Sequence, residues 1–91
     1  MARGPQRSIE QENEEYVLHA LDASKDGAGI REISLQVHRF LKMNGKRRKL
    51  SDDQLQAVLA SLVSQGKVSR RRGEPVTWVI TFEGKRHLPR E

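Results

Sequence analysis

The chain has 91 residues, which allows one small domain, and it has no cysteine, which excludes disulfides and thiolate metal sites. No stretch approaches the roughly 20 apolar residues of a membrane span and the start has no apolar run, so we expect an intracellular protein (cytoplasmic, nucleoid or nuclear) without a membrane partner. The net charge of +5 favours a polyanionic partner over a merely solvated, solubilising surface.

The first seven residues hold Gly, Pro and two arginines without periodicity, and we expect a flexible basic tail over 1–7. Ser8 begins the first predicted helix, because Gln11 three residues later completes a capping-box pattern. This helix is expected to end near Ser24, and its early carboxylates lie where the helix dipole favours anions. Its expected inward face consists of Tyr16, Val17, Ala20 and Leu21, with Leu18 beside them.

The segment 25–29 has turn composition, and Ile30 after it is expected in a very short strand. A second helix is predicted from Arg31 to Met43, and Asn44-Gly45 supplies its stop. Apolar residues at helical spacing give it one inward face: Ile33, Val37, Phe40 and Leu41. A short basic connection, 46–49, then leads to the next helix.

The stretch 51–66 carries the strongest helical pattern of the chain. Ser51 and Gln54 form a second capping-box pattern, and Gly66 is the expected left-handed residue after the last turn. Apolar residues recur at i, i+3, i+4, i+7 and i+8: Leu55, Val58, Leu59, Leu62 and Val63. This predicts a helix with one buried face between two basic segments.

After Gly66 the apolar period changes from 3.6 to about 2. Residues 67–72 are expected to form a strand that ends in a loop, 73–75 a turn, and 77–82 a second strand. Trp78, Ile80 and Phe82 share one face of that second strand. Glu83-Gly84 is expected to close the strand, and 85–91 to be a basic tail with room for one helical turn before Pro89.

The predicted order is α-β-α-α-β-β, an α+β fold in which a three-helix bundle carries a C-terminal β-hairpin over residues 8–84. This is the winged-helix arrangement of the helix-turn-helix class. From Leu55 to about Leu88 the chain also resembles winged-helix DNA-binding domains in its Gly-Lys-Val helix exit, its hairpin and its closing Thr-x-x-Gly-Lys segment. The resemblance implies that the third helix and the hairpin, or wing, approach a duplex.

A narrower resemblance concerns the segment 73–78, which is similar to the wing of Z-DNA-binding (Zα-type) domains. Pro75 and Trp78 match the first proline and the tryptophan of that wing, whereas Val76 stands at its second proline. On the helix, Gln56, Ala60 and Asp52 replace the asparagine, tyrosine and lysine of the family. The resemblance implies that Pro75 and Trp78 meet the nucleic-acid backbone.

The positive charge is concentrated in two short runs around the third helix. Residues 1–41 hold five cations and seven carboxylates, whereas 42–91 hold twelve and five. The two runs are expected to lie on one side of the molecule and to contact phosphates; the alternative is a solvated loop and hairpin tip. Their members are Lys46, Arg47, Arg48, Lys49, Arg70, Arg71 and Arg72.

The third helix is a weaker candidate for reading bases. Gln54 and Gln56 can hydrogen-bond adenine edges and Ser61 either base, but Asp52 and Asp53 oppose phosphate at its N-terminus. Trp78 is either a platform beside the wing or a core residue.

The sequence shows no pattern of a metal site or of a catalytic site. No histidine has metal-ligand spacing, no serine lies in a nucleophile motif, and Asp52 and Asp53 point different ways on a helix. We therefore expect no metal, no cofactor, no catalytic residue and no enzyme.

These observations predict a small winged-helix protein that binds duplex DNA through the wing and the basic connection, as a regulator of transcription or replication. Two alternatives stay open. One is a winged-helix protein-interaction module of a larger complex, with a protein partner or a homodimer. The other is a binder of structured RNA or of left-handed duplexes, since phosphate contacts alone do not distinguish these polymers.

Overall fold

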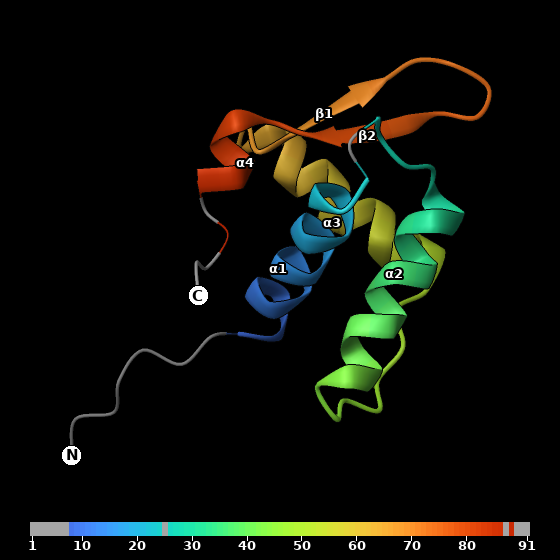
Figure 1. Ribbon diagram of the computed structural model, residues 1–91, viewed down its shortest axis with the longest axis vertical. Coiled ribbons are helices and arrows are strands. Elements are labelled where there is room, and N and C mark those ends of the chain that lie inside the picture. The colour runs from blue at the N-terminus through green and yellow to red at the C-terminus, as the bar shows by residue number, and fades with distance from the viewer. Residues whose placement is uncertain (1–7, 25, 87, 89–91) are drawn as a thin grey trace.

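The computed structural model describes residues 8–24, 26–86 and 88, and contains four helices and two strands within them. Three helices come first: α1 (Ile9–Asp22), α2 (Ile30–Met43) and α3 (Asp52–Ser64). The strands β1 (Val68–Arg71) and β2 (Thr77–Ile80) then form an antiparallel hairpin, and the short helix α4 (Phe82–Arg86) follows. The hairpin lies across one end of the helices (Figure 1). The α+β class and the order of three helices before a hairpin are therefore confirmed.

Both predicted capping boxes are present. In α1 the Ser8 hydroxyl accepts from the Gln11 backbone N–H, and in α3 Ser51 does the same with Gln54. Gly66 has a φ of +76° directly after the C-cap of α3, as the left-handed stop requires. Local sequence signals thus set the ends of α3.

The core lies between the three helices and the inner face of the hairpin. Its largest fully buried side chains are Leu21, Ile33, Leu41, Leu55, Leu59, Leu62, Val17 and Val37. Val68 and Ile80 are directly opposite each other in the hairpin and are both buried, so they close this core from the strand side. Tyr16 and Phe40 are only partly buried at its edge.

The expected short strand is present as a single bridge, but at Ala28 rather than Ile30. Ala28 and Trp78 exchange two backbone hydrogen bonds of 3.0 and 2.9 Å, and Ile30 is already the first residue of α2. Gly27 makes this approach possible, since it has a φ of +96° and a Cβ there would lie 2.9 Å from the Val79 side chain. The loop before α2 is thereby attached to β2.

The end of the chain differs from the prediction. β2 stops at Ile80, Phe82 is 75% exposed instead of facing the core, and Glu83 and Gly84 lie inside α4. Thr81 causes the change: its hydroxyl donates to the Gly66 carbonyl at 2.7 Å and accepts from the Gly84 N–H at 3.1 Å, which starts a helix. The predicted tail over 1–7 and most of that over 87–91 lie outside the described residues.

Gly84 explains the Thr-x-x-Gly spacing physically. The α4 backbone packs so closely on the start of β1 that a Cβ at Gly84 would overlap the Lys67 carbonyl oxygen. The Thr81 N–H also donates to that oxygen, at 3.0 Å. Helix α4 therefore fastens the base of the hairpin to the end of α3.

None of the described helices is long and apolar enough to cross a bilayer.

Candidate functional site

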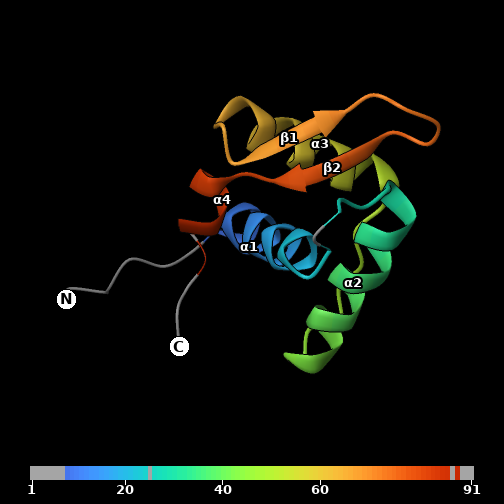
Figure 2. The same ribbon diagram turned by 45° about the horizontal axis from the view of Figure 1, so that its top comes forward.

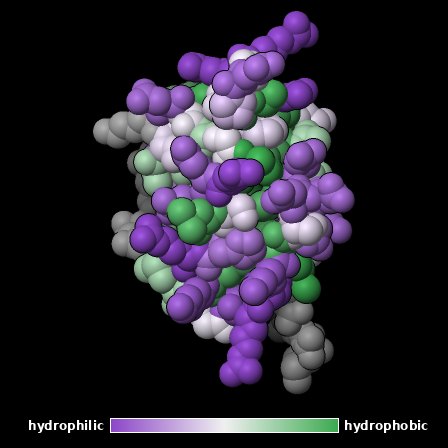
Figure 3. All heavy atoms as spheres, turned by 90° about the vertical axis from the view of Figure 1, so that its right-hand side faces the viewer, coloured by the Kyte–Doolittle hydropathy of each residue, from purple (hydrophilic) through white to green (hydrophobic). Residues whose placement is uncertain are grey.

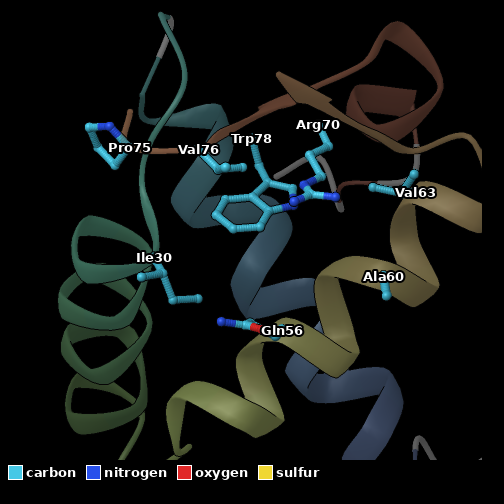
Figure 4. Close-up of a pocket in the computed structure, with 8 residues that line it drawn as sticks. All are labelled: Ile30, Gln56, Ala60, Val63, Arg70, Pro75, Val76 and Trp78. Atoms are coloured by element: carbon cyan, nitrogen blue, oxygen red, sulfur yellow. The ribbon is translucent and has the colours of Figure 1, made fainter. Parts of the chain in front are cut away.

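A groove of about 520 Å³ lies between the exposed side of α3 and the hairpin. Figure 4 shows side chains from α2, α3 and both arms of the hairpin converging on it. Its lining residues are Ile30, Gln56, Ala60, Val63, Arg70, Pro75, Val76 and Trp78. Five of the residues named from the sequence or the resemblance are thus brought together: Gln56, Ala60, Arg70, Pro75 and Trp78.

The register of the hairpin places Arg70 and Trp78 in this groove. The two residues are cross-strand partners, so their side chains share one face, the face that Val68 and Ile80 bury closer to the base. Arg71 pairs with Thr77 and has the opposite orientation. Arg70 is exposed, and in Figure 4 its guanidinium lies beside the indole ring. The hairpin thus presents one arginine to α3 and one to the outer side.

Trp78 is a core residue at the edge of the groove rather than a free platform. Only 9% of it is exposed, its backbone N–H and carbonyl both bond Ala28, and Arg70 is its partner across the hairpin. The indole is therefore packed in place and forms one wall of the groove. The interpretation as a core residue is confirmed, and a role as a platform for a ligand stays a prediction.

The α3 wall of the groove consists of Gln56, Ala60 and Val63, which follow each other at i, i+4 and i+7. They lie beside the buried stripe of Leu55, Leu59 and Leu62. Within the described part of the chain, the Gln56 side chain makes no hydrogen bond. Its amide is therefore free to donate and accept toward a ligand.

The other flank of α3 faces α1 and is acidic. Here the Ser61 hydroxyl donates to a Glu14 carboxylate oxygen at 3.4 Å, and Gln65 donates to the same oxygen at 3.4 Å. The Gln54 side-chain oxygen accepts from the Ser51 N–H at 2.9 Å in the capping box. Of the three predicted base readers, two are thus engaged away from the groove, and only Gln56 lies in it.

Two of the four cations in the basic connection before α3 also bond residues of α1. Arg48 donates to Asn13 at 3.1 and 3.3 Å and pairs with Glu12 at 3.2 Å, and Lys46 lies 3.7 Å from the same carboxylate. Asn13 is buried, and Arg48 satisfies its side-chain oxygen. Arg48 therefore pairs with α1 in a partly buried position, and Lys46 pairs with the same carboxylate while its side chain stays exposed.

The hydrogen bond from Arg48 and the positive charges of Lys46 and Arg48 lower the pKa of Glu12 below its ordinary value of 4.5, against a smaller opposing effect of burial. Arg47 and Lys49 are exposed and form no ion pair within the described residues. Two of the four cations of the connection thus have no ion pair within the described residues.

The expectation that both basic runs lie on one side is wrong for Lys46 and Arg48. The connection begins at the end of α2 that is far from the hairpin, as Figures 1 and 2 both show. It contacts α1 on one flank of α3, while Arg70 lies on the other flank. Within the two basic runs, exposed cations without an ion pair are therefore concentrated at the hairpin, with Arg47 and Lys49 as additions.

His38 has a role that the sequence did not indicate. Its Nε2 accepts from the Leu50 backbone N–H at 3.0 Å, and its Nδ1 lies 3.3 Å from the Ser34 hydroxyl. It thus ties the connection to α2 just before α3 begins. No spacing signal could reveal this, because the contact joins residues twelve positions apart. Among the described residues, no group of three His, Asp or Glu side chains could hold a metal ion.

The side of the molecule that carries α2 and the hairpin loop is mostly hydrophilic. Figure 3 shows hydrophilic side chains standing out at its top and bottom, with apolar residues between them in separate groups. No known family model matches this chain, and no curated protein is similar enough to count as a relative.

Proposed function

We propose that this protein is a winged-helix protein that binds duplex DNA with α3 and the hairpin side by side, as a regulator of transcription or replication. One observation carries the proposal: the hairpin register holds Arg70 against the exposed side of α3, so a cationic strand and a helix face one groove. In winged-helix proteins these two elements meet the duplex and its backbone.

Affinity in this proposal comes from phosphate contacts. In the two basic runs, five exposed cations have no carboxylate partner within the described residues: Arg47, Lys49, Arg70, Arg71 and Arg72. Sequence discrimination is expected to be weak, because Gln56 alone offers a free polar group on the groove side of α3. Asp52 and Asp53 at the start of α3 further reduce the attraction of DNA phosphates to that end of the helix.

A salt series tests the proposal. If the five cations each meet a phosphate, log K for a mixed-sequence duplex should fall with log salt at a slope of about −4 to −5. Fluorescence anisotropy between low and moderate salt measures it. Absence of binding at low salt, or affinity independent of salt, would contradict the proposal. Competition with a matched RNA duplex separates DNA from RNA.

The groove also supports a left-handed duplex as ligand, because Pro75 and Trp78 line it together with Gln56 and Ala60, the positions that the Zα resemblance points to. An alternating CG duplex tests this variant. Inversion of its circular dichroism on addition of protein would support a left-handed ligand, whereas an unchanged spectrum with normal binding would assign ordinary duplex DNA.

A protein-interaction module is the second candidate, and the acidic flank favours it. Glu12 neutralises Lys46 and Arg48, and Glu10 and Glu14 line a second groove between α1 and α3. A defined partner that co-purifies at fixed stoichiometry, together with no affinity for DNA or RNA, would select this function.

A further inference from the structure

The groove between α3 and the hairpin combines three kinds of chemistry. Six of its eight lining residues are apolar: Ile30, Ala60, Val63, Pro75, Val76 and Trp78. The other two are Gln56, with an amide, and Arg70, with the only charge among the lining residues. In Figure 4 the apolar side chains stand on both sides, and Gln56 and Arg70 come from opposite walls.

The space in the groove depends on the small side chain of Ala60. This residue lies one turn after Gln56 and just before Val63, at the middle of the α3 wall. Trp78 opposite is only 9% exposed, so its indole is held by packing and leaves this space open. A concave apolar space with a few polar groups is typical of a site for a small molecule or a single base.

The two polar lining residues, Gln56 and Arg70, would orient a ligand in the groove. Within the described residues the Gln56 amide has no partner, and it offers one donor and one acceptor function to the edge of a ligand. Arg70 attracts an anion at the hairpin wall, and Arg71 and Arg72 extend the positive charge toward the hairpin loop. A flat apolar body, a hydrogen-bonding edge and an attached anion together describe a nucleotide.

We propose, on the basis of the DNA binding proposed above, that this groove holds one unpaired nucleobase of the bound DNA. The base lies between the apolar walls, its edge bonds the Gln56 amide, and its phosphate lies on Arg70. A base that is already unpaired enters at the least cost, because no pairing is lost. The protein then prefers DNA with a single bulged base over fully paired DNA.

Three DNA ligands test the assignment: a mixed-sequence duplex, the same duplex with one bulged thymidine, and the same bulge with an abasic residue. We expect the thymidine bulge to bind roughly tenfold more tightly than the paired duplex, and the abasic bulge to return to within about twofold of it, since the gain comes from burying the base. Anisotropy titrations at one salt concentration measure all three.

Two tryptophan substitutions on α3 locate the base. Ala60→Trp fills the groove and should abolish the preference for the bulge, so that this variant binds the bulged and the paired duplex with equal affinity. Ala57→Trp, which lies on the α1 side of the helix, should keep the preference. If Ala60→Trp melts below the wild type, Gln56→Leu is the second variant, and it should reduce the preference several-fold with normal folding.

The outcomes separate this inference from the proposed function. Equal, salt-dependent affinity for all three ligands would overturn the base site and leave DNA binding intact. Equally tight binding of both bulges would also overturn it, because backbone flexibility would then explain the gain. Survival of the preference in both Ala60→Trp and Gln56→Leu would place the base elsewhere. Absence of binding to all three ligands would overturn both proposals.

Discussion

The two flanks of α3 differ in charge and in how their polar groups are used. On the α1 flank, Glu12 and Glu14 engage Arg48, Lys46 and Ser61, so polar side chains there bond one another. On the hairpin flank, Gln56 and Arg70 form no ion pair or side-chain hydrogen bond within the described residues. Internally satisfied groups stabilise the fold, whereas groups without partners are left for a ligand.

The hairpin flank depends on one close backbone approach, and Gly84→Ala should break it. A Cβ at this position overlaps the Lys67 carbonyl oxygen and lies 2.7 Å from Ile80, so α4 must move away from the hairpin base. We expect a loss of about 3 kcal/mol in unfolding free energy, measured by urea denaturation. Gly73→Ala, in the hairpin loop with ordinary space around it, should change stability little. Equal effects of both changes would contradict this packing role.

Replacement of Arg70, Arg71 and Arg72 by alanine should remove the charge of the hairpin flank. We expect duplex affinity to fall about 100-fold and the salt slope to shrink by about 2.7, because roughly 0.9 counterions are released per phosphate. Stability should stay within about 0.5 kcal/mol, since all three side chains are exposed.

The matched control for this triple variant lowers the net charge equally on another surface. Arg31, Arg39 and Lys42 are exposed on α2 and do not line the groove. Their replacement by alanine should weaken binding much less than the hairpin variant. Equal losses would show that bulk charge, rather than the hairpin flank, determines affinity.

Elements with local signals were predictable from the sequence, and contacts between distant residues were not. The capping boxes at Ser8 and Ser51 and the stop at Gly66 lie within a few residues of the helices that they bound, so pattern alone located α1 and α3. The end of β2 was mispredicted because Thr81 bonds the Gly66 carbonyl, fifteen residues away. Strand propensity in 77–82 contains no information about that bond.

In the candidate site, too, residue type was informative and contacts between distant residues were not predictable. Residue type suggested Arg70 and Gln56 as ligand-facing, and the structure places both in the groove. Type also suggested Arg48 and Ser61, but their carboxylate partners are thirty-six and forty-seven residues away. Charge clustering along the chain therefore overestimates the number of free cations wherever an acidic helix packs against the basic run.

Asn13→Ala should damage the α1 flank without reducing DNA binding. It removes a buried acceptor of two Arg48 hydrogen bonds, and we expect a loss of about 1.5 kcal/mol in unfolding free energy. A double-mutant cycle with Arg48→Ala checks the source of the loss. The two changes should be clearly non-additive. Simple additivity would mean that the Asn13–Arg48 contact contributes nothing.

Glu12→Gln should change the charge of the α1 flank, because Lys46 and Arg48 both lose their carboxylate partner. Arg48 keeps its hydrogen bonds to Asn13, so mainly Lys46 becomes free to approach phosphate. We expect duplex affinity to rise about threefold and the salt slope to steepen slightly. Glu83→Gln is the control, since that carboxylate pairs with Arg86 in α4, outside both flanks. An equal rise in both variants would point to net charge alone.

The same carboxylate should give the α1 flank a pH dependence that the hairpin flank lacks. Arg48 holds the pKa of Glu12 below 4.5 in the folded protein, so the folded state binds this proton less readily than the unfolded chain. The stabilisation by Glu12 is therefore complete above pH 4.5 and is lost as the pH falls through the lowered folded value. NMR titration of the Glu12 carboxyl should give a midpoint below 4.5, and Arg48→Ala should move it upward. A midpoint that stays the same in Arg48→Ala would mean that the arginine does not hold this charge, and the hydrogen bonds to Asn13 would then be what keeps Arg48 on the α1 flank.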